Sequence, residues 1–94
     1  MAADIDEKIE RYERLLAAAL DAATVRPPAG TPLAAAAAEF EEMAAAYLAD
    51  GQHFRSEGDP VNALAAFAYG HAWLDAGARI GLFGVPEGSD LFTV

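Results

Sequence analysis

A few charged and imidazole side chains in the second half of the chain could do chemistry, and their spacing places them on helix faces. His71 and Asp75 are four residues apart, as are Asp75 and Arg79, so a helix puts each pair side by side. The first pair has the side-chain types that bind metal ions, and the second predicts an ion pair. Arg79 could also bind a partner's carboxylate or an anion. Asp50 and His53 form a further pair of metal-binding side-chain types.

A metal site shared by the two histidines is disfavoured by their separation. In an antiparallel hairpin, His53 would lie level with Ala63, which precedes His71 by eight residues. At about 1.5 Å per residue this is about 12 Å along the helix axis, whereas ligands lie about 2 Å from a metal ion. We therefore predict no metal and no cofactor. A small-ligand or metal-binding bundle is the alternative hypothesis, and it would use Asp50, Asn62, Tyr69, His71, Asp75 and Arg79.

The chain offers no nucleophile in a catalytic setting. It contains no cysteine, and its serines, Ser56 and Ser89, fall in a predicted turn and in the tail. No glycine-rich phosphate loop follows a strand, because the sequence contains no convincing strand. We therefore expect no enzymatic activity.

The elements that position these side chains are three predicted helices in a single domain, 1–94. A chain of 94 residues forms one domain, and apolar residues recur in it at three- and four-residue steps. Asp4 and Glu7 have capping-box spacing, while Thr31 and Asp59 each precede a proline that suits the first helical position. The predicted elements are helices over about 5–24, 32–56 and 60–83, and a tail over 84–94.

These elements predict an all-α three-helix bundle in which the second and third helices form a central antiparallel hairpin. Only a short turn around Gly58 separates the two helices, and such a turn makes them antiparallel neighbours. Gly84 and Pro86 are expected to end the third helix. The tail contains three apolar residues, Leu91, Phe92 and Val94. We expect one of three arrangements: the tail folds back on the bundle, docks elsewhere or frays.

Asp50 falls on the same apolar stripe as Tyr47 and Phe54, so its carboxylate is expected to point inward. A buried carboxylate needs hydrogen-bond partners. Asn62 and Tyr69 lie within about one helical turn of its level, and both can donate. We therefore predict a polar clamp that fixes the register of the hairpin.

The third predicted helix is apolar almost all the way round, and within 59–82 only three residues carry a formal charge. Such a helix must be covered on several sides, and this short chain has little material to do so. We predict a homodimer that buries the remaining face, including Trp73. Gly77 and Gly81 are small enough to let another helix approach closely. An unidentified protein partner would bury the same face.

The charge balance is strongly acidic. Fifteen acids stand against six bases, for a net charge of −9, and Lys8 is the only lysine. Such a surface repels phosphate backbones and anionic lipids, so nucleic-acid binding is disfavoured. No apolar run reaches the roughly 18 residues of a membrane span, and the acidic N-terminus does not resemble a signal peptide, so we expect a cytoplasmic protein without a membrane partner. The many carboxylates and the single lysine are typical of a halophile.

Part of the hairpin, residues 44–74, resembles one tetratricopeptide motif. The matching positions are Leu48, Gly51, Phe54, Ala63 and Phe67. Such repeats need several copies to bury a continuous core, and only one is present here. The resemblance implies a helix–turn–helix hairpin, and it supports an alternative function as a peptide-binding groove.

A second set of residues carries a closer resemblance. These residues are Tyr47, Asp50, Phe54, Gly58, Asp59, Asn62, Ala63, Tyr69, Trp73, Leu74, Asp75, Ala76, Gly77, Arg79, Gly81 and Leu82. With them the chain resembles a small archaeal family known as domain of unknown function 357. The resemblance implies a short helical bundle, an archaeal origin and no assigned activity, and it carries over no catalytic residue.

The sequence thus favours a non-enzymatic interaction or adaptor module that acts through protein–protein contacts and self-association. The reason is an excess of apolar helix surface without a catalytic cluster. The residues expected to carry structure or interaction are Asp50, Asn62, Tyr69, Trp73, Asp75, Gly77, Arg79 and Gly81.

Overall fold

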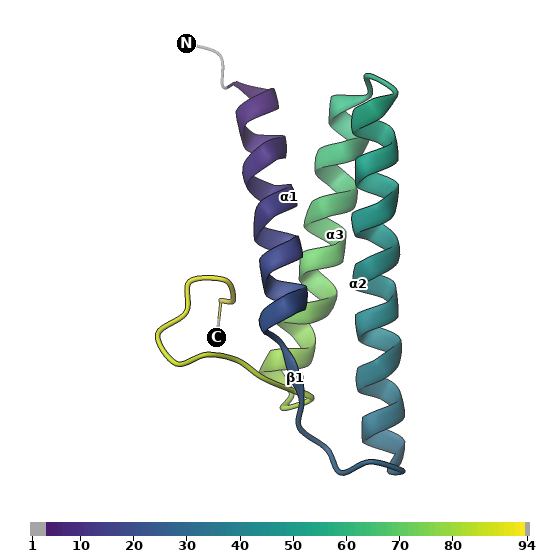
Figure 1. Cartoon of the computed structure of the whole chain (residues 1–94), viewed down its shortest axis with the longest axis vertical. Helices are drawn as coiled ribbons and strands as arrows, with labels where there is room; N and C mark the ends of the chain where they lie inside the picture. The colour runs from purple at the N-terminus through teal and green to yellow at the C-terminus, as the bar shows by residue number, and fades with distance from the viewer. Residues whose placement is uncertain (1–3, 94) are drawn as a thin grey trace.

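The chain folds as three helices that lie side by side, as the computed structural model of residues 4–93 shows (Figure 1). Helix α3 lies between the other two and contacts both of them more extensively than α1 contacts α2. The predicted all-α bundle with a central α2–α3 hairpin is therefore confirmed. The elements are α1 (Ile5–Ala22), β1 (Thr24–Val25), α2 (Pro32–Ser56), α3 (Pro60–Arg79) and β2 (Phe83–Gly84).

Each helix begins at a side-chain cap, as the sequence predicts. The side chain of Asp4 accepts a hydrogen bond from the backbone of Glu7 at 3.2 Å. Thr31 caps α2 in the same way, and Asp59 caps α3. Each cap satisfies one of the backbone N–H groups that a helix N-terminus leaves without an intrahelical partner.

Helix α3 ends at Arg79, four residues earlier than predicted, and α1 ends at Ala22 and not near Thr24. The reason for the early end of α3 is Gly81, whose φ of +84° is easily adopted only by glycine. The Leu82 N–H then turns back to the Gly77 carbonyl at 2.8 Å, which closes a Schellman motif. The stop predicted at Gly84 was therefore three residues too late.

A short antiparallel strand pair, which the sequence did not indicate, follows this stop. Thr24 pairs with Gly84, and Val25 pairs with Phe83. The Arg26 N–H adds a hydrogen bond to the Leu82 carbonyl at 2.9 Å. The pair fastens the connection after α1 to the segment that leaves α3.

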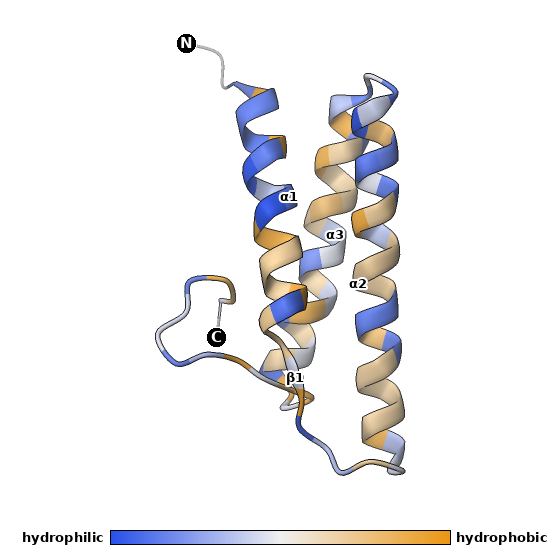
Figure 2. Cartoon of the chain, viewed as in Figure 1, coloured by the Kyte–Doolittle hydropathy of each residue, from blue (hydrophilic) through white to orange (hydrophobic). Residues whose placement is uncertain are grey.

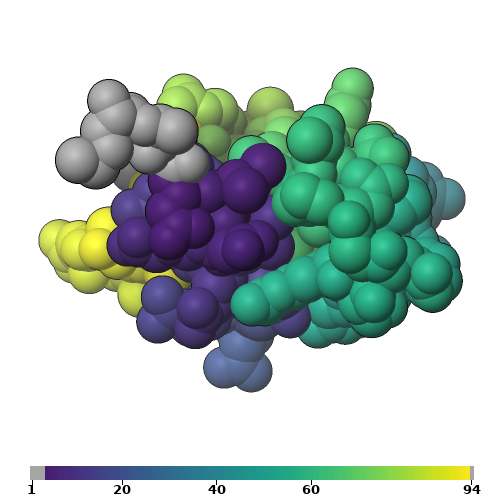
Figure 3. Space-filling model, turned by 90° about the horizontal axis from the view of Figure 1, so that it is seen from above, coloured from purple at the N-terminus to yellow at the C-terminus, as the bar shows by residue number. Residues whose placement is uncertain are grey.

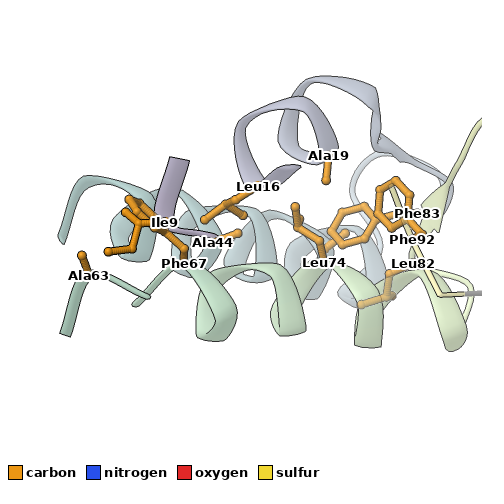
Figure 4. Close-up of a cluster of buried hydrophobic side chains, with 11 residues drawn as sticks. Ile9, Leu16, Ala19, Ala44, Ala63, Phe67, Leu74, Leu82, Phe83 and Phe92 are labelled. Atoms are coloured by element: carbon orange, nitrogen blue, oxygen red, sulfur yellow. The ribbon is translucent and has the colours of Figure 1, made fainter. Parts of the chain in front are cut away.

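The core lies between the three helices and is closed at one end by residues that follow α3 (Figure 4). The fully buried residues of α2 are all small, namely Ala37, Ala44 and Gly51, and they are spaced seven apart. The other buried apolar residues are Ile9, Leu16, Ala19, Ala63, Ala66, Phe67, Leu74, Leu82, Phe83 and Phe92.

The tail folds back on the bundle, which decides between the alternatives left open for it. Phe92 is only 5% exposed and belongs to the core, and Leu91 packs against the same cluster. Seen along the helices, the tail lies beside α1, on the side away from α2 (Figure 3). Val94 lies outside the described residues.

Candidate functional site

One face of α3 is left uncovered by the other elements of residues 4–93. Apolar residues run along most of α3, whereas the first half of α1 is largely hydrophilic (Figure 2). Helix α1 and the tail cover the opposite side of α3. An open face agrees with the expectation that so short a chain does not cover α3 on every side, and the dimer expected to bury this face stays a prediction. We define the alanine stripe as the exposed residues Val61, Ala65, Ala68, Ala72 and Ala76.

An apolar groove adjoins the alanine stripe where α3 meets α2. The rings of Phe40 and Trp73 meet edge to face, with their centroids 5.0 Å apart. Nearer the turn, Tyr47 stacks on Tyr69 at 5.5 Å, although Tyr69 is 63% exposed. Met43 stands at the α2 edge and is also exposed. We define the aromatic groove by Phe40, Met43, Tyr47, Tyr69 and Trp73.

Two hollows adjoin the Phe40–Trp73 pair, one on each side. The hollow on the α3 side has a volume of about 300 Å³, and its other lining residues are Tyr69, Ala72 and Ala76. The hollow on the α2 side has a volume of about 340 Å³, and it is lined by Met43 together with Glu39 and Glu42. The aromatic groove is therefore apolar on one edge and acidic on the other.

Asp50 does not form the predicted clamp. Its side chain is exposed, because Gly51 and not Asp50 faces the core at this level of α2. Asn62 donates instead to Asp59 at 2.7 Å, within the cap of its own helix. Tyr69 stacks on Tyr47 as described above. Asp50 thus stands at the surface, one turn beyond Tyr47.

Asp75 and Arg79 meet through the tail and form no direct salt bridge with each other. The Asp75 carboxylate accepts hydrogen bonds from both the backbone N–H, at 2.8 Å, and the hydroxyl of Thr93. Arg79 donates to the carbonyl of Thr93 at 3.0 Å and to its hydroxyl at 2.9 Å. The predicted ion pair is therefore replaced by a clasp in which the two side chains hold Thr93 between them.

The clasp changes the proton affinity of Asp75. Partial burial would raise the pKa of this carboxyl, but the two hydrogen bonds from Thr93 outweigh it, helped by the nearby charges of His71 and Arg79. The pKa of Asp75 therefore lies below its ordinary value. The ring of His71 hydrogen-bonds to the Leu91 carbonyl through Nε2, so α3 holds the tail at two successive turns.

The residues of the alternative ligand site are divided between different surfaces. His71 and Asp75 face the tail, while Asp50 stands exposed on α2 and Asn62 belongs to the cap of α3. Within residues 4–93, no three side chains of the metal-binding types gather closely enough to hold an ion together.

The two glycines expected to admit another helix serve the chain itself. A Cβ atom at Gly77 would overlap the ring of Phe83 and would lie 3.2 Å from Phe40. Gly81 ends α3 and has no neighbour within 4 Å of the place of a Cβ atom. The prediction that these glycines form a helix-docking surface was wrong for Gly77. The exposed small residues of α3 are the alanines of the stripe.

The sequence reasoning missed two positions where helices come close together. A Cβ atom at Gly70 would lie 2.7 Å from Leu16 of α1 and 3.2 Å from the Ala44 carbonyl of α2. Gly51 likewise admits the Phe67 ring. The available signal was the seven-residue spacing of Ala37, Ala44 and Gly51. Alanine and glycine are only weakly apolar, so they contribute little to the hydrophobic periodicity from which a buried helix face is predicted.

The fold and these surfaces define a small three-helix bundle whose hairpin carries an open apolar face. The family model described as Protein of unknown function (DUF357) matches residues 11–83, and the chain belongs to this family. Comparisons with curated proteins and with solved structures found no match. Among the helices of residues 4–93, none combines the length and the apolar character that crossing a membrane requires.

Proposed function

We propose that the protein is a non-enzymatic interaction module that acts through protein–protein contacts made by the open face of its α2–α3 hairpin. The observation that carries the proposal is that the alanine stripe is continuous with the aromatic groove, because Ala72 and Ala76 of the stripe also line the hollow on the α3 side of the groove. Contiguous apolar surface of this kind, bordered by polar residues, is typical of interaction sites. Its aromatic and methionine side chains are those enriched at the centres of interfaces.

Self-association is the simplest way to cover the alanine stripe. Alanine side chains are short, so a second α3 could approach across them at a small distance between helix axes. A twofold arrangement would pack the stripe against its own copy, with Ala68 and Ala72 near the middle. Neither residue touches the core, so the contact needs no rearrangement of the bundle.

The test is the molar mass in solution of arginine variants of the stripe. Ala65→Arg and Ala72→Arg place a long charged side chain on the stripe, and both should shift a dimer to the monomer. Ala17→Arg, at an exposed position of α1, makes the same chemical change outside the open face and should leave the mass unchanged. Far-UV circular dichroism verifies that each variant is folded. If both stripe variants keep the molar mass of the wild type, the proposed face is wrong.

We further propose an archaeal, salt-rich cytoplasm as the setting of this module. The net charge of −9 on 94 residues favours unfolding through self-repulsion, and dissolved salt screens that repulsion. The free energy of unfolding should therefore rise with KCl concentration, as urea denaturation at increasing KCl would measure. Stability that is unchanged or falls between dilute and molar KCl would contradict this setting.

A further inference from the structure

We infer that the aromatic groove is a binding site for a basic amphipathic helix of another protein. The inference rests on the proposed function and adds to it the chemistry of the partner. It concerns the groove between α2 and α3, whereas self-association concerns the alanine stripe.

The shape and lining of the groove favour a helix as the occupant. Two antiparallel helices border it, and a third helix laid between their ridges would complete a four-helix arrangement. The hollows on either side of the Phe40–Trp73 pair offer separate sites for apolar side chains. Apolar residues at three- and four-residue steps on one face of the incoming helix would enter them.

The negative charge around the groove favours a partner with a positively charged surface. Glu39 and Glu42 line the hollow on the α2 side, and Asp50 stands exposed on the same helix. No lysine or arginine occurs in 32–54 or 60–78, the parts of the two helices that border the groove. Arg55 and Arg79, the basic residues just beyond these stretches, are bonded to Glu13 and to Thr93.

Lysine and arginine side chains on the partner would therefore meet carboxylates at one edge and aromatic rings at the other. Exposed rings such as Tyr69 also attract cations to their faces. A second copy of this chain carries the same net charge of −9 and does not complement the acidic edge. Anionic lipid and nucleic acid are repelled for the same reason.

The probe is a synthetic peptide of about 18 residues, about 27 Å long as a helix. It carries leucines at three- and four-residue steps and lysines elsewhere. One comparison peptide replaces each lysine by glutamate, and another scrambles the lysine peptide so that no apolar face forms. Trp73 reports binding directly, because it is the only tryptophan and lines both hollows.

The lysine peptide should shift the Trp73 emission to shorter wavelength, and the other two peptides should not. The affinity should fall as KCl is raised, at concentrations where the protein stays folded. The double variant Glu39→Gln and Glu42→Gln should bind about five- to tenfold more weakly, the effect of losing two exposed ion pairs. A control pair on α1, Glu10→Gln with Asp21→Asn, changes the net charge equally and should bind as the wild type does.

The inference is overturned if the lysine peptide leaves Trp73 unchanged, if the scrambled peptide binds equally well, or if both double variants lose affinity alike. Ala65→Arg distinguishes a failure of this inference from a failure of the proposed function. Ala65 belongs to the alanine stripe and lines neither hollow, so the substitution tests self-association without changing the aromatic groove. That variant should lose self-association and retain peptide binding.

Discussion

The Phe40 ring packs against the Trp73 ring at 85° between their planes, and this pair joins the two helices at the centre of the open face. It separates the two hollows and therefore gives the aromatic groove its shape. The same Phe40 ring also lies close to Gly77, which has no side chain to hold it away. One contact thus links the packing of the hairpin to the surface proposed for recognition.

Phe40→Ala should lower the stability of the hairpin and change the surroundings of Trp73. Phe40 is partly exposed, so its removal should cost about 2 kcal/mol, less than the roughly 3–5 kcal/mol typical of a fully buried phenylalanine. Trp73 should lose part of its near-UV circular dichroism, because its edge-to-face neighbour is gone. Urea denaturation gives the stability, and Leu33→Ala, at an exposed apolar position of the same helix, is the control. A Trp73 spectrum that is unchanged in Phe40→Ala would contradict this packing.

Phe92 should contribute strongly to stability although it lies near the end of the chain. Its side chain is buried with Leu74, Leu82 and Phe83, so Phe92→Ala should cost about 3 kcal/mol. Ile80→Ala removes an apolar side chain that is 69% exposed and should change stability by less than about 0.5 kcal/mol. Equal losses in the two variants would mean that the tail does not dock in solution.

The clasp on Thr93 should make tail docking depend on pH in the acidic range. Because folding lowers the pKa of Asp75, its carboxylate stabilises the folded state fully above the ordinary aspartate value of about 3.9. That contribution is lost as the pH falls through the lower pKa of the folded state. Asp75→Asn removes the contribution at neutral pH, so the stability difference from the wild type should shrink below about pH 4.

Hydrogen exchange at the Thr93 amide measures directly whether the clasp is formed, because this N–H donates to Asp75. Exchange should be faster in Asp75→Asn than in the wild type at neutral pH. Asp90→Asn, at an exposed tail position, is the control and should exchange as the wild type does. Fast exchange in the wild type at neutral pH would show that the clasp is not formed.

Gly70 should resist substitution because of one identifiable neighbour. Gly70→Ala places a methyl group against Leu16 and should cost about 1–3 kcal/mol, despite the better helix propensity of alanine. In a Leu16→Ala background the same substitution should cost less, because the overlapping side chain is gone. A double-mutant cycle with urea denaturation measures this coupling. Additive losses would place the strain elsewhere, for example at the Ala44 carbonyl.

The helix starts and the hairpin could be predicted because their signals are local. Thr31 and Asp59 are capping residues followed by proline, and both cap as expected. The orientation of α2 could not be predicted equally well, because its core face runs through alanines and Gly51. The larger apolar residues of α2, such as Tyr47, recur at three- and four-residue steps and predicted a core face that included Asp50. In the structure these residues lie along the edge of the open face.

The remaining differences depend on contacts between distant parts of the chain. Asp75 and Arg79 were correctly placed on one helix face, but their shared partner Thr93 comes from the tail. The end of α3 depended on which glycine takes a positive φ, and the hydrogen bonds around Gly81 decide this. Trp73 and Tyr69 were both singled out from the sequence, Tyr69 as a donor to Asp50, and both line the hollow on the α3 side of the aromatic groove. Their part in an interaction stays a prediction.

The most direct test of the open face is absolute molar mass by light scattering, for the wild type and Ala72→Arg, in molar KCl and in dilute buffer. The wild type should have twice the 9.8 kDa of one chain in molar KCl, and it should dissociate partly in dilute buffer as the charges repel. Ala72→Arg should give the mass of one chain in both. A wild-type protein that is folded and monomeric in molar KCl would contradict self-association through the alanine stripe.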